Sequence, residues 1–209
     1  MIVAVAVGPK ARRSNQSAGT LPGYFYRLPA RAQHIWLKSD SIDRFDLVPD
    51  TATFSLAKSL MGTLASGAPL TIERSAQELA DQMCGLMGVR GVRIEVRGVR
   101  PHNTRGELHG IFYPHGPSSS LGPPLIILWM RTAQRHDVVK PRTFRRTLMH
   151  ELGHYLDYAL LRLEESFHTT GFFRRESFLV RILSPAEGAA PSAGSSPRSG
   201  DEKASRNGH

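Results

Sequence analysis

The chain is poor in cysteine and has no long hydrophobic run. Cys84 is the only cysteine in 209 residues, which excludes an internal disulfide and any metal site built from clustered cysteines. A single thiol fits a reducing, cytoplasmic location. No segment approaches the roughly 18 consecutive apolar residues of a transmembrane helix, and the apolar start MIVAVAV lacks the basic region of a signal peptide. We therefore expect a folded protein that neither spans a membrane nor is exported.

Charge and composition divide the chain into three parts. The formal net charge is +9, and most of the excess lies in residues 51–183, which favours anionic partners such as nucleic acid. Residues 184–209 are rich in Ser, Gly, Pro and Ala and predict a disordered tail. Residues 1–50 contain two weak strand patterns, GYFYRL and HIWLK, and are expected to be poorly organised. The folded domain should span residues 51–183.

Two helices are expected at the start of that domain. The organised region should start near Thr51, where the run TFSLAKSLMGTLA predicts the first helix. The second should open at Ser75, because Glu78 three residues later completes a capping-box pattern. Apolar residues then recur at helical spacing until Gly88, which marks the end of the helix.

Three segments further along carry strand patterns. Val92, Ile94 and Val96 alternate with charged residues, which is the period of a strand that buries one face. The segments ELHGIFYP and PLIILWM follow across loops rich in Gly and Pro. PLIILWM is apolar throughout, which favours a place deep in a sheet or along a covered edge. The fold class expected is α+β, with a small sheet packed on helices.

Pro141 opens the longest helical pattern, which runs roughly from Thr143 to Leu163. One wide face of this helix is apolar. Gly153 interrupts it at a cost of about 1 kcal/mol relative to alanine, which indicates the close approach of a strand or loop. The polar side carries the residues His150, His154 and Asp157.

The motif HELGH on this helix predicts a metal site. Histidines at positions 150 and 154 project one turn apart from one face, so their imidazoles can converge on one cation. Glu151 is turned aside by one residue, where it can take a proton from a metal-activated water without acting as a ligand. The motif therefore predicts zinc ligation by His150 and His154, with Glu151 as general base.

A catalytic zinc needs a third protein ligand, and the sequence offers two. His168 lies 14 residues after His154, just past the expected helix end, where a returning loop could bring it to the other histidines. Glu176 lies in a further short helix, FFRRESFLVRIL, a placement that suits a glutamate ligand. Asp157 is placed to accept a hydrogen bond from a ligand imidazole or from the neighbouring chain, and so to fix its orientation.

Arginines gather at the start of the motif helix. Arg142, Arg145 and Arg146 occupy its first turns, where the helix dipole disfavours cations. With other arginines they could form a surface that contacts DNA phosphates, although scattered solvated charge is the favoured interpretation. The other arginines in this hypothesis are Arg93, Arg97 and Arg100.

From PLIILWM through RTLMHELGHYLDY to SFHTTGFF, the chain resembles the SprT-like and WLM-type metallopeptidases. In these families a strand, an HExxH helix and an H-x-x-x-F element build the zinc site, and His168 and Phe172 have that spacing. The resemblance covers roughly Val92 to Leu183. It differs in HTTGF where HGxxF is usual, which keeps Glu176 open as the third ligand, and in lacking the cysteines of the zinc ribbon that the family often carries.

The resemblance implies a compact zincin-like domain that binds one Zn²⁺ and hydrolyses protein or peptide substrates, in some members proteins attached to DNA. A substrate strand should add to a sheet edge, with PLIILWM as a wall of the cleft. Tyr155, Tyr158 or an arginine of the last helix could stabilise the oxyanion. Two alternatives to a peptidase are a non-proteolytic zinc domain for nucleic-acid or protein binding, and a surface helix without metal.

Overall fold

The structure, a computed structural model, describes residues 21–104, 106–117 and 122–184. Within these ranges it contains five α-helices and a small sheet, so the α+β class is confirmed. No helix in the described part of the chain is long and apolar enough to cross a membrane. The predicted tail lies outside the described residues except for Ser184, and so do residues 1–20 of the N-terminal segment.

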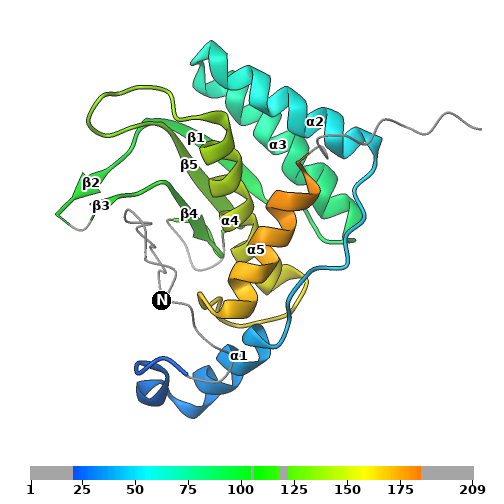
Figure 1. Cartoon of the computed structure of the whole chain (residues 1–209), viewed down its shortest axis with the longest axis vertical. Helices are drawn as coiled ribbons and strands as arrows, with labels where there is room; N and C mark the ends of the chain where they lie inside the picture. Colours follow the sequence, from blue (N-terminus) through cyan, green and yellow to red (C-terminus); the bar gives the residue numbers. More distant parts are fainter. Residues whose placement is uncertain (1–20, 105, 118–121, 185–209) are drawn as a thin grey trace, which may run out of the picture.

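A three-stranded sheet occupies the centre of the fold (Figure 1). β5 (Leu125–Arg131) runs parallel to β1 (Arg93–Val99) on one side and antiparallel to β4 (Gly110–Tyr113) on the other. A small hairpin of β2 (His102–Asn103) and β3 (Gly106–Glu107) connects β1 to β4. PLIILWM thus lies deep in the sheet, as expected. Because both edges of β5 are paired, a substrate strand cannot add to β5 itself, and the role of PLIILWM as a wall of the cleft stays a prediction.

Four helices pack around this sheet. α2 (Thr51–Thr63) packs on α3 (Pro69–Leu86), which contacts β1. α4 (Pro141–Ala159) crosses the sheet at β4 and β5, and α5 (Thr170–Ile182) packs beside α4 (Figure 1). α2 begins where the sequence predicts, because the Asp50 carboxylate accepts a hydrogen bond from the Thr53 N–H at 2.8 Å and caps the helix.

α3 begins earlier than predicted. Its first residue is Pro69, a residue suited to the first helical position because its fixed φ matches the helix and its missing N–H has no helical partner to lose. Ser75 is a buried residue inside the helix, so the predicted capping box with Glu78 is wrong. The helix ends at Leu86, just before Gly88, which has a positive φ of 66°.

Residues 21–50 are well organised, contrary to the prediction. GYFYRL and HIWLK contribute to a 3₁₀ turn, η1 (Phe25–Arg27), and to helix α1 (Ala30–Asp40), and neither forms a strand. α1 packs on α5, and the following loop sends Phe45 and Leu47 into the main core. The first helix therefore belongs to the same packed unit as the motif helix.

The outer edge of β1 is closed by side chains of α3. The N–H groups of Ile94 and Val96 donate to Gln77 Oε1 at 2.8 Å and to Glu73 Oε2 at 2.9 Å. Gln77 also donates to the carbonyl of Val92. These bonds satisfy the backbone groups that an edge strand would otherwise offer to another chain.

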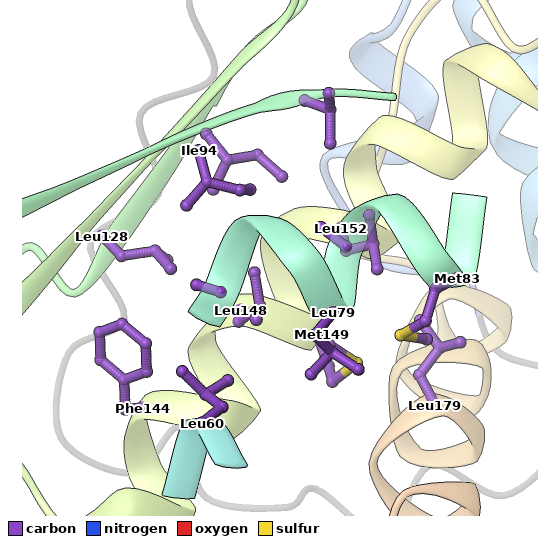
Figure 2. Packing of buried hydrophobic residues seen from close by; sticks show 14 of the residues in the cluster. Leu60, Leu79, Met83, Ile94, Leu128, Phe144, Leu148, Met149, Leu152 and Leu179 are labelled. Atoms are coloured by element: carbon purple, nitrogen blue, oxygen red, sulfur yellow. The ribbon is translucent and has the colours of Figure 1, made fainter. Parts of the chain in front are cut away.

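The main hydrophobic core lies between the sheet and the helices (Figure 2). Leu128 of β5, Leu79 of α3 and the pair Leu148 and Leu152 of α4 are all completely buried there. Since burial of each such side chain contributes on the order of 1.5–3 kcal/mol, this packing fixes α4 firmly on the sheet. The opposite side of α4 carries the histidines.

Candidate metal centre

The histidine side of α4 is buried. His150 and His154 are 7% and 6% exposed, and every residue from 148 to 157 is buried. The Cα of Gly110 in β4, the loop after α4 and the start of α5 surround this side. The surface placement in the third alternative is therefore wrong, whereas its lack of a metal is a separate question that metal analysis answers.

Three imidazoles meet at this place. Nε2 of His168 lies 3.0 Å from Nε2 of His154 and 3.1 Å from Nε2 of His150. A tetrahedral cation with metal–nitrogen bonds of about 2.0–2.1 Å separates its ligand atoms by about 3.3 Å. The three histidines are thus close enough to hold a metal ion.

The second nitrogen of His154 is fixed by a hydrogen-bonded relay. Ser166 Oγ donates to Asp157 Oδ2 at 2.7 Å, so it accepts from His154 Nδ1, also at 2.7 Å. This places the proton of a neutral His154 on Nδ1 and leaves the Nε2 lone pair directed at the other two histidines. Asp157 therefore acts on the imidazole through Ser166, a residue that the sequence did not single out.

Glu176 fixes His150 in the same way. Its Oε2 lies 3.2 Å from Nδ1 of His150, and its Oε1 accepts a hydrogen bond from Arg146 Nε at 2.8 Å. A carboxylate only accepts, so His150 donates from Nδ1 and Nε2 is free for a metal. Of the two candidates for the third ligand, His168 lies among the converging nitrogens, whereas Glu176 lies on the far side of His150.

The ring of Phe172 contacts all three imidazoles. It stacks on His154 with centroids 4.4 Å apart and meets His150 and His168 edge to face at 5.2 and 5.1 Å. A Cβ added to Gly153 would lie 3.4 Å from this ring. The close approach predicted at Gly153 is therefore made by a side chain of α5.

A buried ion pair ties this site to the first helix. Arg175 and Asp157 are both fully buried, and Nη2 of the guanidinium donates to both carboxylate oxygens, at 2.9 and 3.2 Å. Nη1 donates to the carbonyl of Ser39 in the last turn of α1 and to the carbonyl of Ile42 just after the helix. Gly171 allows this contact, because a Cβ there would lie 2.5 Å from the carbonyl oxygens of α1.

Burial sets the protonation of the histidines in the metal-free chain. Burial, together with the neighbouring charge of His150, holds the pKa of His154 well below its usual value and lowers the pKa of His168 to about 4. Burial also opposes charge on His150, but the hydrogen bond with Glu176 and the nearby carboxylates outweigh it and raise its pKa. Two of the three imidazoles are thus neutral and ready to donate a lone pair.

Glu151 reaches from α4 to the edge of β4 that has no partner strand among the described residues. The N–H of Trp129 donates to the carbonyl of His109, so the antiparallel register directs the backbone groups of Gly110 and Phe112 away from β5. The N–H of Phe112 donates to the Glu151 carboxylate. A Cβ on Gly110 would lie 2.9 Å from Oε1 of Glu151, so the glycine makes room for this carboxylate.

Two of the suggested oxyanion donors face elsewhere. The hydroxyl of Tyr155 donates to the carbonyl of Arg90 on the core side of α4, and Arg175 is bound to Asp157. The suggestion of Tyr155 is therefore wrong, and Arg175 is excluded as the arginine of the last helix that could serve, whereas the wider suggestion of an arginine from α5 stays a prediction. Tyr158 packs against Phe112 with ring centroids 5.6 Å apart.

The arginines of the predicted phosphate surface differ in exposure: some are buried and paired, and others are exposed. Arg145 is buried and donates to the carbonyl of Leu183 and to Ser184 Oγ. Arg100 is buried and paired with Glu107 at 3.2 Å. These two are not free to contact a phosphate, so this part of the prediction is wrong. Arg93 and Arg97 flank Glu95 on β1, and Arg142 and Arg146 remain exposed on α4.

Replacing Ser166 with alanine should weaken metal binding by about 10- to 100-fold, because His154 then loses the acceptor that fixes its tautomer. Competition with a chromophoric chelator measures the affinity. Ser41→Ala, which removes an exposed serine hydroxyl after α1, is the matched control and should bind as the wild type does. Equal affinity of the two variants would contradict the role given to Ser166.

Comparisons with models of known protein families, with curated proteins and with solved structures found no match to this chain. A function is therefore assigned from the geometry of the site alone: the three converging imidazoles, the hydrogen-bond partners of Nδ1 in His150 and His154, and the carboxylate of Glu151 beside β4.

Proposed function

We propose that the chain is a zinc-dependent peptidase of the zincin-like type, with Glu151 as general base. This proposal rests mainly on the convergence of three imidazole Nε2 atoms. Nε2 of His168 lies 3.0 Å from Nε2 of His154 and 3.1 Å from Nε2 of His150. Three neutral nitrogen ligands and one open position are the donor set of many catalytic zinc sites.

The residues present fit a zinc ion. His150, His154 and His168 would hold it, and the hydrogen bonds at Nδ1 of His150 and His154 orient the imidazoles for that task. When bound, zinc lowers the pKa of a coordinated water toward neutrality and polarises a carbonyl group. The fixed tautomers reduce the rearrangement that metal binding requires.

Glu151 is suited to move a proton. Burial, opposed by the charge of His150, raises the pKa of Glu151 to about 7 in the metal-free chain. A carboxyl group with a pKa near neutrality can take the proton of the attacking water and then return it to the leaving amine. One residue thus serves as base and as acid in the two halves of peptide hydrolysis.

The edge of β4 beside Glu151 is suited to bind an extended substrate. Gly110 directs its N–H and C=O outward, and Phe112 directs its C=O outward beside Glu151. A peptide that adds to this edge as a further strand would pass next to the carboxylate. The substrate class favoured is an extended or unfolded segment of protein, because the backbone provides the recognition.

The metal part of this proposal predicts about one zinc ion per chain in the purified wild type. His168→Ala should lose stoichiometric zinc, because it removes a ligand. Glu176→Gln should retain zinc with lower affinity, because it disturbs only the partner of His150. Elemental analysis after gel filtration measures both. Zinc retained by His168→Ala but lost by Glu176→Gln would reverse the ligand assignment.

Activity is tested on an unstructured protein such as casein. The zinc-loaded chain should cleave it, a chelator should abolish cleavage, and added Zn²⁺ should restore it. Stoichiometric zinc without any cleavage of unfolded substrates would reject the peptidase and favour the non-proteolytic zinc domain.

A further inference from the structure

A basic pocket lies between the start of α4 and the end of α5, away from the three histidines. Its volume is about 270 Å³, and it is lined by two residues of α4 and four residues at or near the end of α5. Three of the six lining residues are arginines and two are serines. The lining residues are Arg142, Arg146, Ser177, Val180, Arg181 and Ser184.

The positive charge of this pocket is poorly neutralised. Among the residues that the structure describes, Arg142 and Arg181 have no carboxylate partner within ion-pair distance. Arg146 donates from Nε to Glu176, a carboxylate that is itself shared with His150 and is only 3% exposed. Arg142 and Arg181 therefore bring two positive charges to the lining of the pocket that no carboxylate among the described residues neutralises.

The arginines near the start of α4 repel one another and, without a bound anion, destabilise this end of the helix. Arg142 lies in the first turn of the helix, where the dipole repels cations and attracts anions, and Arg146 lies one turn further along the same face. Burial, and after it the charge of Arg142, lowers the pKa of the neighbouring Arg145. A bound anion would offset both the dipole and the mutual repulsion.

We propose that this pocket binds an oxyanion of the phosphate class. Guanidinium groups bind phosphate oxygens through paired N–H donors, and the side chains of Arg142, Arg146 and Arg181 surround the pocket with Ser177 as a hydroxyl partner. Arg145 is not part of the site, because its guanidinium is bound to the end of α5. The proposal does not rest on the peptidase activity, and Arg146 connects this pocket to the histidines through Glu176.

The test is calorimetric titration of the full chain with inorganic phosphate at constant ionic strength. The protein is first freed of metal, so that phosphate cannot coordinate an ion at the histidines. We expect saturable binding with a dissociation constant of about 1 mM or lower. Arg142→Gln and Arg181→Gln should each weaken it at least about tenfold. Arg146 is left unchanged because it also bonds Glu176.

Arg93→Gln is the matched control. Arg93 is an exposed arginine of β1 outside the pocket, and its replacement lowers the net charge by the same amount. The control should bind phosphate as the wild type does. Absence of saturable binding to the wild type, or equal weakening in all three variants, would overturn the proposal.

Competition identifies the source of the phosphate group. A nucleotide monophosphate that displaces inorganic phosphate from the pocket indicates a small phosphorylated ligand. A short DNA duplex that displaces it, with loss of displacement in Arg181→Gln, indicates a nucleic-acid backbone. Displacement by neither leaves free phosphate as the ligand.

Discussion

Glu151→Gln should reduce kcat/KM for peptide hydrolysis by about 10²- to 10⁴-fold while the chain keeps its zinc. Glutamine cannot take the proton of the attacking water. It retains an oxygen that accepts the N–H of Phe112, so the contact with β4 is preserved. The measurement combines initial rates on a fluorogenic unstructured substrate with zinc analysis of the same sample.

The control for this variant is Glu164→Gln, which removes an exposed carboxylate in the loop after α4. It should cleave as the wild type does. Full activity of Glu151→Gln would reject the assignment of the general base, and loss of zinc from this variant would show that Glu151 contributes to the metal site itself.

Arg175→Met should lower the free energy of unfolding by about 3–5 kcal/mol. The guanidinium is fully buried and bonds Asp157 and the carbonyls of Ser39 and Ile42. Methionine fills much of the volume but leaves the carboxylate of Asp157 buried beside Ser166 alone. Urea unfolding of the metal-free protein measures the loss without a contribution from metal binding.

Arg174 provides the comparison for this variant. It is the preceding residue of α5, and its ion pair with Asp43 is exposed on both sides. Arg174→Met should cost far less, because water replaces the lost partner. If the two variants lose equal stability, the buried pair does not hold α1 to α5. In Arg175→Met, replacing Asp157 with asparagine should recover part of the loss, since no charge is then left unpaired.

Local patterns predicted the elements that depend on neighbouring residues. The alternation of Val92, Ile94 and Val96 predicted β1, and the apolar stripe of the motif helix predicted α4 within a few residues at each end. The HELGH spacing predicted that His150 and His154 share a face. These features follow from helix and strand geometry alone, so a single sequence contains them.

Contacts between distant segments were not predictable in this way. Both His168 and Glu176 have a spacing that suits a third ligand. Only the path of the chain back along α4 decides that His168, and not Glu176, lies beside the other two histidines. Ser166 and Arg175 looked like ordinary polar residues because their partners lie in other elements. Gly110 carried a weak signal, since a glycine within a strand often marks a close approach. The helix of residues 30–40 was not predicted either, because it packs on α5, which lies far away in the sequence.

The bonds between Arg175 and Ser39 span 136 positions in the chain. Contacts of such long range form late in folding, because a large loop must close before they can contribute. During synthesis, the HELGH helix emerges before residue 175 and so before the guanidinium that holds Asp157 in place. We expect the histidines to take up their final geometry only after residue 175 has joined the fold, later than the helix that carries two of them.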